Sequence, residues 1–324
     1  DLRMSRGLGD VYKRQAAAWQ RAAQIYAGRQ DMANMAKYYE GLIQNFPKAS
    51  PAALAEAHFL LGRAAFDQGD FKSSISHMAE AKTLDPQKYG EQVNVLSVLS
   101  YHKLQDMNKL KEALETLQKE NPSAVARVPD VIPAWLGLQA YGMKDLETAD
   151  KYMTWATQND QLQNVKKVIW RNLAKVRLAL RKYDRALVAS NNFLKDEDQP
   201  YRRADGMLDK ASILLGLGKY ADARKTAEDA LALGVEGPLM ASLKIVLGDI
   251  SYAEKKFDEA AKHYGVTAEL FVNDAELKPK ALFKAAEALD KAGRKSEASQ
   301  YRGRLQKEFP DWKQDGESLP PDAR

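Results

Sequence analysis

A frame of small and apolar residues recurs along this chain of 324 residues with a period near 37. It is seen when "LGRAAFDQGDFKSSISHMAEA" from Leu61 is compared with "LGDISYAEKKFDEAAKHYGVT" from Leu247. A small residue is followed twelve positions later by a second small residue, and in most copies an aromatic residue or leucine stands nine positions after the first. From Ala149 onward the second small residues are 37, 37, 37 and 38 positions apart. A fixed period of this length indicates a repeat architecture.

Three sets of residues define the frame. The first small residue is Gly62, Gly137, Ala174, Ala211, Gly248 or Ala286. The aromatic residue or leucine is Phe71, Leu146, Tyr183, Tyr220 or Phe257. The second small residue is Ser74, Ala149, Ala186, Ala223, Ala260 or Ala298. The gap between Ser74 and Ala149 leaves room for one degenerate copy around Ala113.

The residues predict a helical hairpin in each copy. Two apolar segments at helical spacing are separated by a polar turn such as "DQGD", "GLGK" or "KAGR". Small residues at the two fixed positions let the first and second helices approach closely, and the aromatic residue fills the remaining gap. One hairpin cannot bury its own apolar face, so we expect the hairpins to stack on one another.

The frame resembles the tetratricopeptide repeat (TPR), whose pattern is W-x2-L-G-x2-Y, then A-x3-F, then A, then P. The residues that match are Trp19, Ala23, Tyr26, Tyr39 and Pro47; Leu61, Gly62, Ala81 and Pro86; Trp170, Leu173, Ala174 and Ala186; and Leu282, Ala286, Ala298 and Pro310. The copy near 94–121 departs most, with Tyr101 where a small residue is expected. The period also exceeds the usual 34 residues of the family.

The resemblance implies an all-α fold, a right-handed α-solenoid of about eight TPR-like hairpins with one continuous elongated core. The solenoid is expected to span residues 16–312. Its repeats are placed near 16–49, 55–88, 94–125, 130–163, 167–200, 204–237, 241–274 and 279–312.

Residues that carry chemistry do not gather into a recognisable catalytic or metal motif. The stretch "LLGLGKY" at 214–220 lacks the full phosphate-loop pattern and a preceding strand, and Gly218 suits an inter-helix turn. The segment "KDEDQ" at 195–199 lacks the glycine and spacing of a calcium loop. His58 and His77 lie on one predicted hairpin and can meet, although a structural or exposed role is favoured over a metal site. We therefore expect no catalytic residues, no metal and no cofactor, and predict that the chain is not an enzyme.

Charge and amino-acid composition limit the kinds of partner and site that are expected. The formal charge of +5 is spread along the chain, so nucleic acid is not expected as a partner. No run of about 18 apolar residues is present, so no transmembrane segment is expected in this sequence. The absence of cysteine excludes disulfides and thiolate metal sites.

The concave face that a TPR solenoid implies is lined by the first helix of each hairpin. The frame projects nine side chains onto that face as candidates for contact with a protein or peptide partner, because aromatic residues and arginine contribute strongly to interfaces. These candidates are Arg63, Phe66, His102, Tyr141, Arg171, Lys175, Asp209, Asp249 and Tyr252.

Three functions remain open. The first is a protein-interaction scaffold that binds a peptide or partner protein through the concave face of the superhelix. The second is the repeat portion of a larger enzyme or envelope-assembly protein whose active domain lies upstream. The third is a regulatory or nucleic-acid-associated TPR protein.

The segment that follows Tyr38 resembles repeats of bacterial cell-envelope proteins, such as the C-terminal domain of the TolA-binding coiled-coil protein and the outer-membrane assembly lipoproteins. The shared loop is aromatic-Pro-x-Ser-Pro-x-Ala, matched here by Phe46, Pro47, Ser50, Pro51 and, one residue late, Ala53. This resemblance favours a bacterial periplasm or cell envelope over the cytoplasm.

Both ends of the sequence differ from the repeats. Residues 5–15, "SRGLGDVYKRQ", match the translation of a transposon-based sequencing adapter joined to its mosaic end. We therefore expect residues 1–15 to be non-native and disordered and the sequence to be a gene fragment. Residues 313–324 carry two prolines, a glycine and charge without apolar period, and are expected to form a disordered tail.

Overall fold

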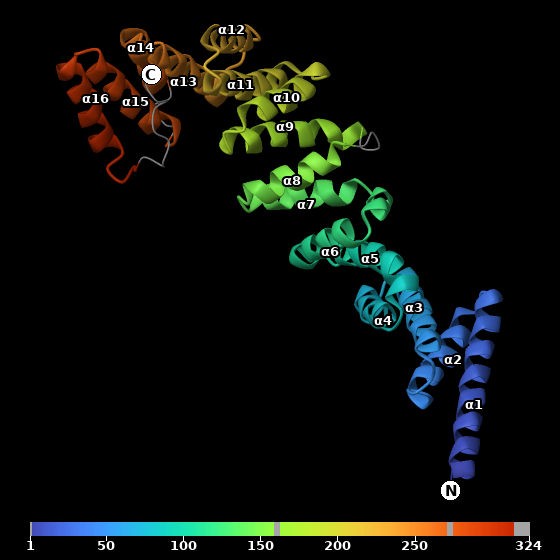
Figure 1. Ribbon diagram of the computed structural model, residues 1–324. Helices are drawn as coiled ribbons and strands as arrows, with labels where there is room; N and C mark the ends of the chain where they lie inside the picture. Colours follow the sequence, from blue (N-terminus) through green and yellow to red (C-terminus); the bar gives the residue numbers. More distant parts are fainter. Residues whose placement is uncertain (1, 159–162, 271–274, 314–324) are drawn as a thin grey trace. The chain divides into compact units, whose positions relative to one another are not determined.

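The computed structural model describes residues 2–158, 163–270 and 275–313, and in these residues the regular structure is entirely helical (Figure 1). The helices pair into eight hairpins, as predicted, and they belong to two compact units, Asp1–Ile132 and Pro133–Arg324. The division differs from the single continuous core that was expected. It falls between Ile132 and Pro133, in the first turn of the helix that follows the longest link between hairpins, the ten residues 121–130.

Unit 1 holds three hairpins and a short 3-10 helix. Its helices are α1 (Leu2–Gly28), α2 (Met32–Asn45), α3 (Pro51–Asp67), α4 (Phe71–Leu84), α5 (Pro86–Lys103), α6 (Met107–Glu120) and η1 (Pro122–Arg127). Tyr39, Leu42, Met78, Leu110 and Leu114 are among its most completely buried side chains.

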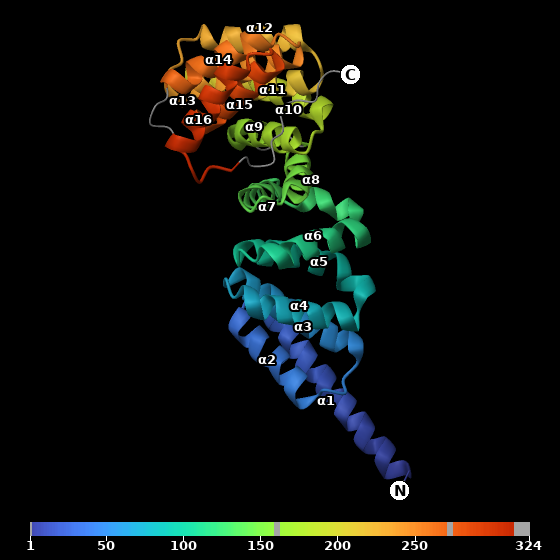
Figure 2. The ribbon, with the colours of Figure 1, turned by 90° about the vertical axis from the view of Figure 1, so that its left-hand side faces the viewer.

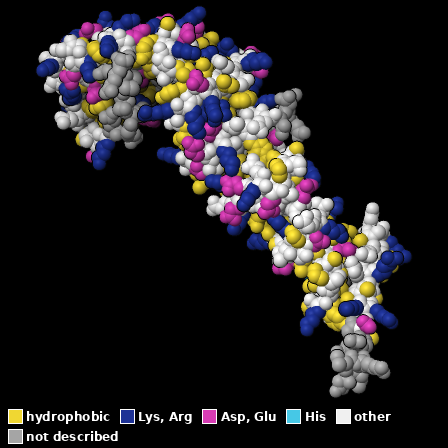
Figure 3. Space-filling view, viewed as in Figure 1, with side chains coloured by type: hydrophobic (Ala, Val, Ile, Leu, Met, Phe, Trp, Pro, Cys, Tyr) yellow, Lys and Arg dark blue, Asp and Glu magenta, His cyan; other side chains and the backbone are white. Residues whose placement is uncertain are grey.

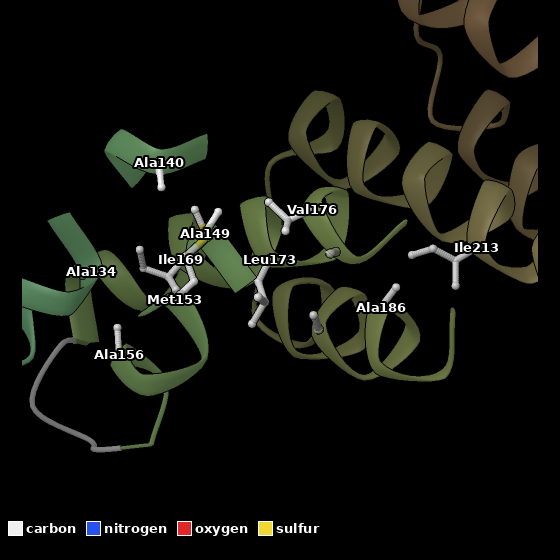
Figure 4. Packing of buried hydrophobic residues seen from close by; sticks show 12 residues of the cluster. Ala134, Ala140, Ala149, Met153, Ala156, Ile169, Leu173, Val176, Ala186 and Ile213 are labelled. Carbon is white, nitrogen blue, oxygen red and sulfur yellow. The ribbon is translucent and has the colours of Figure 1, made fainter. Parts of the chain in front are cut away.

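Unit 2 holds five hairpins. Its helices are α7 (Val131–Gly142), α8 (Leu146–Ala156), α9 (Gln163–Ala179), α10 (Tyr183–Lys195), α11 (Pro200–Gly216), α12 (Tyr220–Leu231), α13 (Gly237–Ala253), α14 (Phe257–Leu270), α15 (Leu277–Lys291) and α16 (Lys295–Glu308). In Figure 2 these helices run from light green at α7 to red at α16. The core between α8 and α9 contains Met153, Ile169 and Leu173, all almost fully buried (Figure 4).

Every hairpin turns in the same way. One residue in each turn has a positive φ, at Gln30, Gly69, Gln105, Lys144, Arg181, Gly218, Lys255 and Gly293. The N–H of the next residue bonds to the carbonyl five positions earlier, as from Asp70 to Ala65 at 2.9 Å and from Lys219 to Leu214 at 2.9 Å. This is the Schellman arrangement, which ends the first helix and reverses the chain. The positive-φ residue, hereafter the turn residue, therefore gives each hairpin an exact register.

The turn residue corrects the register of the third hairpin. Its turn residue is Gln105, so the two frame positions are Val98 and Leu110 rather than Tyr101 and Ala113, and both are fully buried. The hairpin spans 86–120, not 94–125. Large residues stand where other copies have small ones, which is why the frame was hard to recognise there.

The small residues of the frame lie where two helices touch. A Cβ added at Gly137 on α7 would stand 2.7 Å from Met153 Cγ on α8, and one at Gly248 would stand 2.4 Å from a ring carbon of Tyr264. Real Cβ atoms do not approach so closely, so these glycines are required by the spacing of the helices.

The expectation for residues 1–15 is wrong in one respect, because Leu2–Gln15 is helical and continues into α1. Within this segment Tyr12 packs at the end of α2: its ring lies 5.2 Å from that of Phe46, and its hydroxyl accepts a hydrogen bond from Lys48 N–H at 3.0 Å. The tail predicted at 313–324 lies outside the described residues, apart from Lys313. No helix in the described part of the chain is both long and apolar enough to cross a membrane.

Candidate functional site

The first helices of successive hairpins form one layer in each unit. In unit 2, α9 contacts α11, α11 contacts α13 and α13 contacts α15, whereas the second helices of neighbouring hairpins make few contacts or none. In unit 1, α3 contacts both α1 and α5. Because the first helices lie closer together than the second helices, the stack curves toward them. We call the face that α9, α11, α13 and α15 form the inner face of unit 2.

Ion pairs connect neighbouring first helices along the inner face. Arg171 on α9 pairs with Asp205 on α11. One turn further along the same helices, Lys175 Nζ lies 3.9 Å from Asp209 Oδ2. The Arg171 guanidinium also lies over the Phe193 ring, 6.0 Å from its centroid. These side chains are partly exposed, and Asp209 is the least exposed of the four.

The same contact recurs two hairpins later with its charges exchanged. Asp249 on α13 accepts a hydrogen bond from Lys284 Nζ on α15 at 2.7 Å and another from the Tyr264 hydroxyl at 2.6 Å. Asp249 and Lys175 both stand six positions before their turn residues, and Lys284 and Asp209 both stand nine before theirs. The inner face therefore uses one pair of frame positions to join adjacent hairpins by opposite charges.

Asp209 is the most strongly perturbed carboxyl group of this face. Burial raises its pKa to about 6, against the weaker opposing effect of Lys175 and Arg171. Its Oδ2 atom is buried without a hydrogen-bond donor. A carboxylate removed from water in this way is less favourable than one at the surface.

The nine projected candidates do not form one free binding surface. In unit 2, Arg171, Lys175, Asp209 and Asp249 are engaged with the neighbouring hairpin. Tyr252 is only 5% exposed and packs edge-on against Phe257, with the ring centroids 5.2 Å apart. Tyr141 is half-buried against the core.

The three candidates in unit 1 differ from one another in their surroundings. Arg63 is exposed, His102 is half-buried, and Phe66 packs edge-on against Phe71 with ring centroids 5.4 Å apart. Burial and the charge of Lys103 lower the pKa of His102. Phe66 thus supports the hairpin turn.

Two half-buried leucines of the first helices were not among the candidates. Leu178 and Leu215 stand three positions before their turn residues, the same frame position as Tyr141 and Tyr252, and the four residues are spaced by 37. Both leucines are half-buried against the core. We call Tyr141, Leu178, Leu215 and Tyr252 the inner row. The 37-residue spacing identifies the two leucines in the sequence. They were not predicted because the candidates were limited to aromatic and charged residues.

Two histidines of unit 1 do meet. His58 on α3 and His77 on α4 bring their Nδ1 atoms to 3.1 Å, and both rings are half-buried. Neither at this pair nor in the rest of the described residues is a group of three or more histidine, aspartate or glutamate side chains arranged to hold a metal ion.

Charge on the molecular surface is mixed. On the face turned toward the viewer in Figure 3, basic and acidic side chains are interspersed with apolar ones. The described residues thus offer stacked helical hairpins, an inner layer with internally paired charges and a row of apolar side chains. They define a helical-repeat scaffold.

The family models identify the repeat. Two models described as tetratricopeptide repeat match the chain, one at residues 36–89 and 208–271 and the other at 17–49 and 280–311. The chain belongs to the tetratricopeptide repeat family. Folds of this type are typically non-catalytic binding scaffolds. No curated protein sequence gives a significant match to it.

Solved structures are similar to the chain at low sequence identity. A structure of Naa15/Naa10 bound to HypK-THB has a TM-score of 0.50 and 15% identity, over 92% of this chain and 43% of that one. The apo form of the quorum sensor NprR from B. thuringiensis has a TM-score of 0.46 and 15% identity, over 90% of this chain and 86% of that one. The apo form of RapI has a TM-score of 0.48 and 15% identity, over 80% of this chain and 78% of that one.

Proposed function

We propose that this TPR protein is a binding scaffold whose inner face in unit 2 holds a peptide or a segment of a partner protein. The observation that carries the proposal is the layer of first helices, which has the half-buried side chains of Tyr141, Leu178 and Leu215 at one repeated frame position. Stacked repeats of this kind characteristically bind partners along an extended concave surface. In this account the chain binds and does not catalyse.

The paired charges indicate what kind of partner segment fits. Arg171, Lys175 and Lys284 each already face a carboxylate of the neighbouring hairpin. A partner that relied on an acidic group would have to displace these carboxylates and leave them unpaired, which is unfavourable in a partly buried layer. The half-buried Leu178 and Leu215 offer apolar contact instead. The proposed partner segment is therefore recognised mainly through apolar side chains.

Peptide selection followed by hydrogen exchange tests the location of binding. Peptides are selected from a random displayed library against the full chain, and amide exchange is then compared with and without a selected peptide. We expect the peptide to slow exchange in α9, α11 and α13, because it covers their inner face. Slowed exchange confined to second helices such as α10 and α12 would place the binding surface elsewhere.

A further inference from the structure

His58 and His77 of unit 1 occupy positions at which the repeat frame does not require histidine. His58 lies on α3 and His77 on α4, and their rings are 5.2 Å apart between centroids with a tilt of 45°. The approach depends on Gly62, since a Cβ at that glycine would stand 3.2 Å from His77 Cβ. The absence of a side chain at Gly62 therefore lets the two helices come close enough for the imidazoles to touch.

The distance between the nitrogens suits a shared metal ion. The two Nδ1 atoms are 3.1 Å apart, so one ring donates its N–H and the other accepts. Imidazole nitrogens bind transition metals at roughly 2.0–2.1 Å, so two of them on one ion stand about 2.9 Å apart at a right angle and about 3.3 Å apart in a tetrahedron. The observed separation lies between these values. An ion takes the place of the shared proton when the donor ring moves its proton from Nδ1 to Nε2.

The surroundings keep both rings in the form that binds a metal. Burial lowers the pKa of His58 and of His77, which favours the neutral imidazole. The charged side chains that act on the pair are carboxylates, Glu80 on both rings and Glu40 of α2 on His77. Glu80 is exposed and stands three residues after His77, on the same side of α4. Negative charge beside two neutral imidazoles favours a divalent cation.

We propose that His58 and His77 bind one divalent transition-metal ion across the α3–α4 hairpin through their Nδ1 atoms, with the remaining positions open to water or to Glu80. Two protein ligands make a weaker and more exchangeable site than the three or four of a structural zinc centre. Nitrogen ligands select Zn²⁺, Ni²⁺ or Cu²⁺ over Mg²⁺ and Ca²⁺, which prefer oxygen.

The chain supplies a matched control for this proposal. Its four histidines are His58, His77, His102 and His263, and it has no cysteine. The test variant His58→Asn with His77→Asn and the control variant His102→Asn with His263→Asn each remove two imidazoles. Asparagine keeps a polar side chain of moderate size, and circular dichroism without metal checks that each variant is folded.

Isothermal titration of the full chain, prepared without a histidine tag, with Zn²⁺ or Ni²⁺ measures the site. We expect one ion per chain, no comparable heat with Mg²⁺, and a melting temperature that rises with Zn²⁺ concentration. The test variant should weaken binding by at least about tenfold, and the control variant should bind like the unaltered chain. Equal binding by the test variant and the unaltered chain, or no binding of either metal by the unaltered chain, would overturn the proposal. Glu80→Gln with a smaller loss of affinity would identify the third ligand, whereas no loss would assign that position to water.

Discussion

At the scale of single residues, Asp209 shows how burial of a carboxylate within the layer of first helices affects the stability of the fold. Burial raises the pKa of its carboxyl group to about 6, from a usual value of 3.8. The folded protein therefore binds a proton at Asp209 more tightly than the unfolded chain does. It follows that the contribution of Asp209 to stability falls as the pH rises from about 4 to about 6.

Asp209→Asn removes this dependence on pH. We expect the variant to differ little from the unaltered protein near pH 4 and to be more stable above pH 6, by roughly 1–3 kcal/mol. Urea unfolding at intervals between pH 4 and pH 7 measures the difference. Asp229→Asn, at an exposed position of α12, controls for the change of charge. A difference between variant and unaltered protein that stays constant with pH would contradict the assignment.

Two glycines of α7 allow a test of how closely α7 packs against α8. Gly137 and Gly142 both lie on α7, but a Cβ at Gly137 would stand 2.9 Å from the backbone nitrogen of Met153, and one at Gly142 would meet nothing within 4 Å. Gly137→Ala should cost about 1–3 kcal/mol of unfolding free energy because backbone cannot move aside easily. Gly142→Ala should change it by less than about 1 kcal/mol. Equal effects of the two substitutions in thermal unfolding would show that α7 and α8 are not held this closely.

At the scale of helices, the second helix of a hairpin begins in two different ways. In the first four hairpins the residue before it is aspartate, and Asp145, for example, accepts a hydrogen bond from Thr148 N–H at 3.2 Å. In the four later hairpins Lys182, Lys219, Lys256 and Arg294 hold this position. The side chains of Lys182, Lys219 and Arg294 make no such bond. A cation there is unfavourable for the helix dipole, so it requires another role.

Ion pairs with the preceding hairpin provide that role at two of these four positions. Lys182 Nζ lies 2.8 Å from Glu147 Oε2 and 3.0 Å from Asp150 Oδ2 of α8, and Arg294 pairs with Asp258 of α14 at 3.0 Å. Asp150 is itself buried against Arg177, at 2.8 Å. Lys219 makes no ion pair in the described part of the chain. The sequence position that caps the second helix in the first four hairpins thus joins neighbouring hairpins at two of the later ones.

The same substitution at two equivalent positions should therefore have opposite effects. Lys219→Asp restores a helix cap and should stabilise the protein by about 1 kcal/mol. Lys182→Asp removes two ion pairs and adds a carboxylate beside Glu147 and the buried Asp150, so it should destabilise by about 1–3 kcal/mol. Melting temperatures of the two variants make the comparison. Changes of the same sign in both would mean that position within the hairpin, rather than the partner across hairpins, decides the effect.

At the scale of the whole molecule, the sequence predicted the eight hairpins because each turn and each close helix contact depends on a few residues at fixed spacing. The frame positions of the third hairpin were not predicted, because they hold the large residues Val98 and Leu110 where other hairpins have small residues. The envelope location and the adapter origin of residues 5–15 stay predictions.

Contacts between hairpins were harder to predict than the hairpins themselves. Arg171 pairs with Asp205 and Lys175 with Asp209, in both cases 34 residues further along, although the period is 37. The offset arises because each first helix meets the next one about one turn closer to its N-terminus. When one repeat is considered alone, a charged side chain such as Arg171 has no partner. The stacked structure shows that its charge is paired with a residue of the next hairpin.

Binding through the inner face is the central claim, and a selected peptide measures it most directly. Leu178→Ala with Leu215→Ala alters the inner row, and Val188→Ala with Val266→Ala removes two exposed apolar side chains from the second helices α10 and α14. Circular dichroism confirms that both variants are folded. Fluorescence anisotropy then gives the dissociation constant of the peptide for each variant at low and high salt.

We expect the inner-row variant to bind the peptide at least about tenfold more weakly, because few buried contacts carry most of an interface's energy. The second-helix variant should bind like the unaltered chain, and affinity should change little with salt because the charges of the face are already paired. Unchanged affinity in the inner-row variant, together with a loss in the second-helix variant, would contradict the claim.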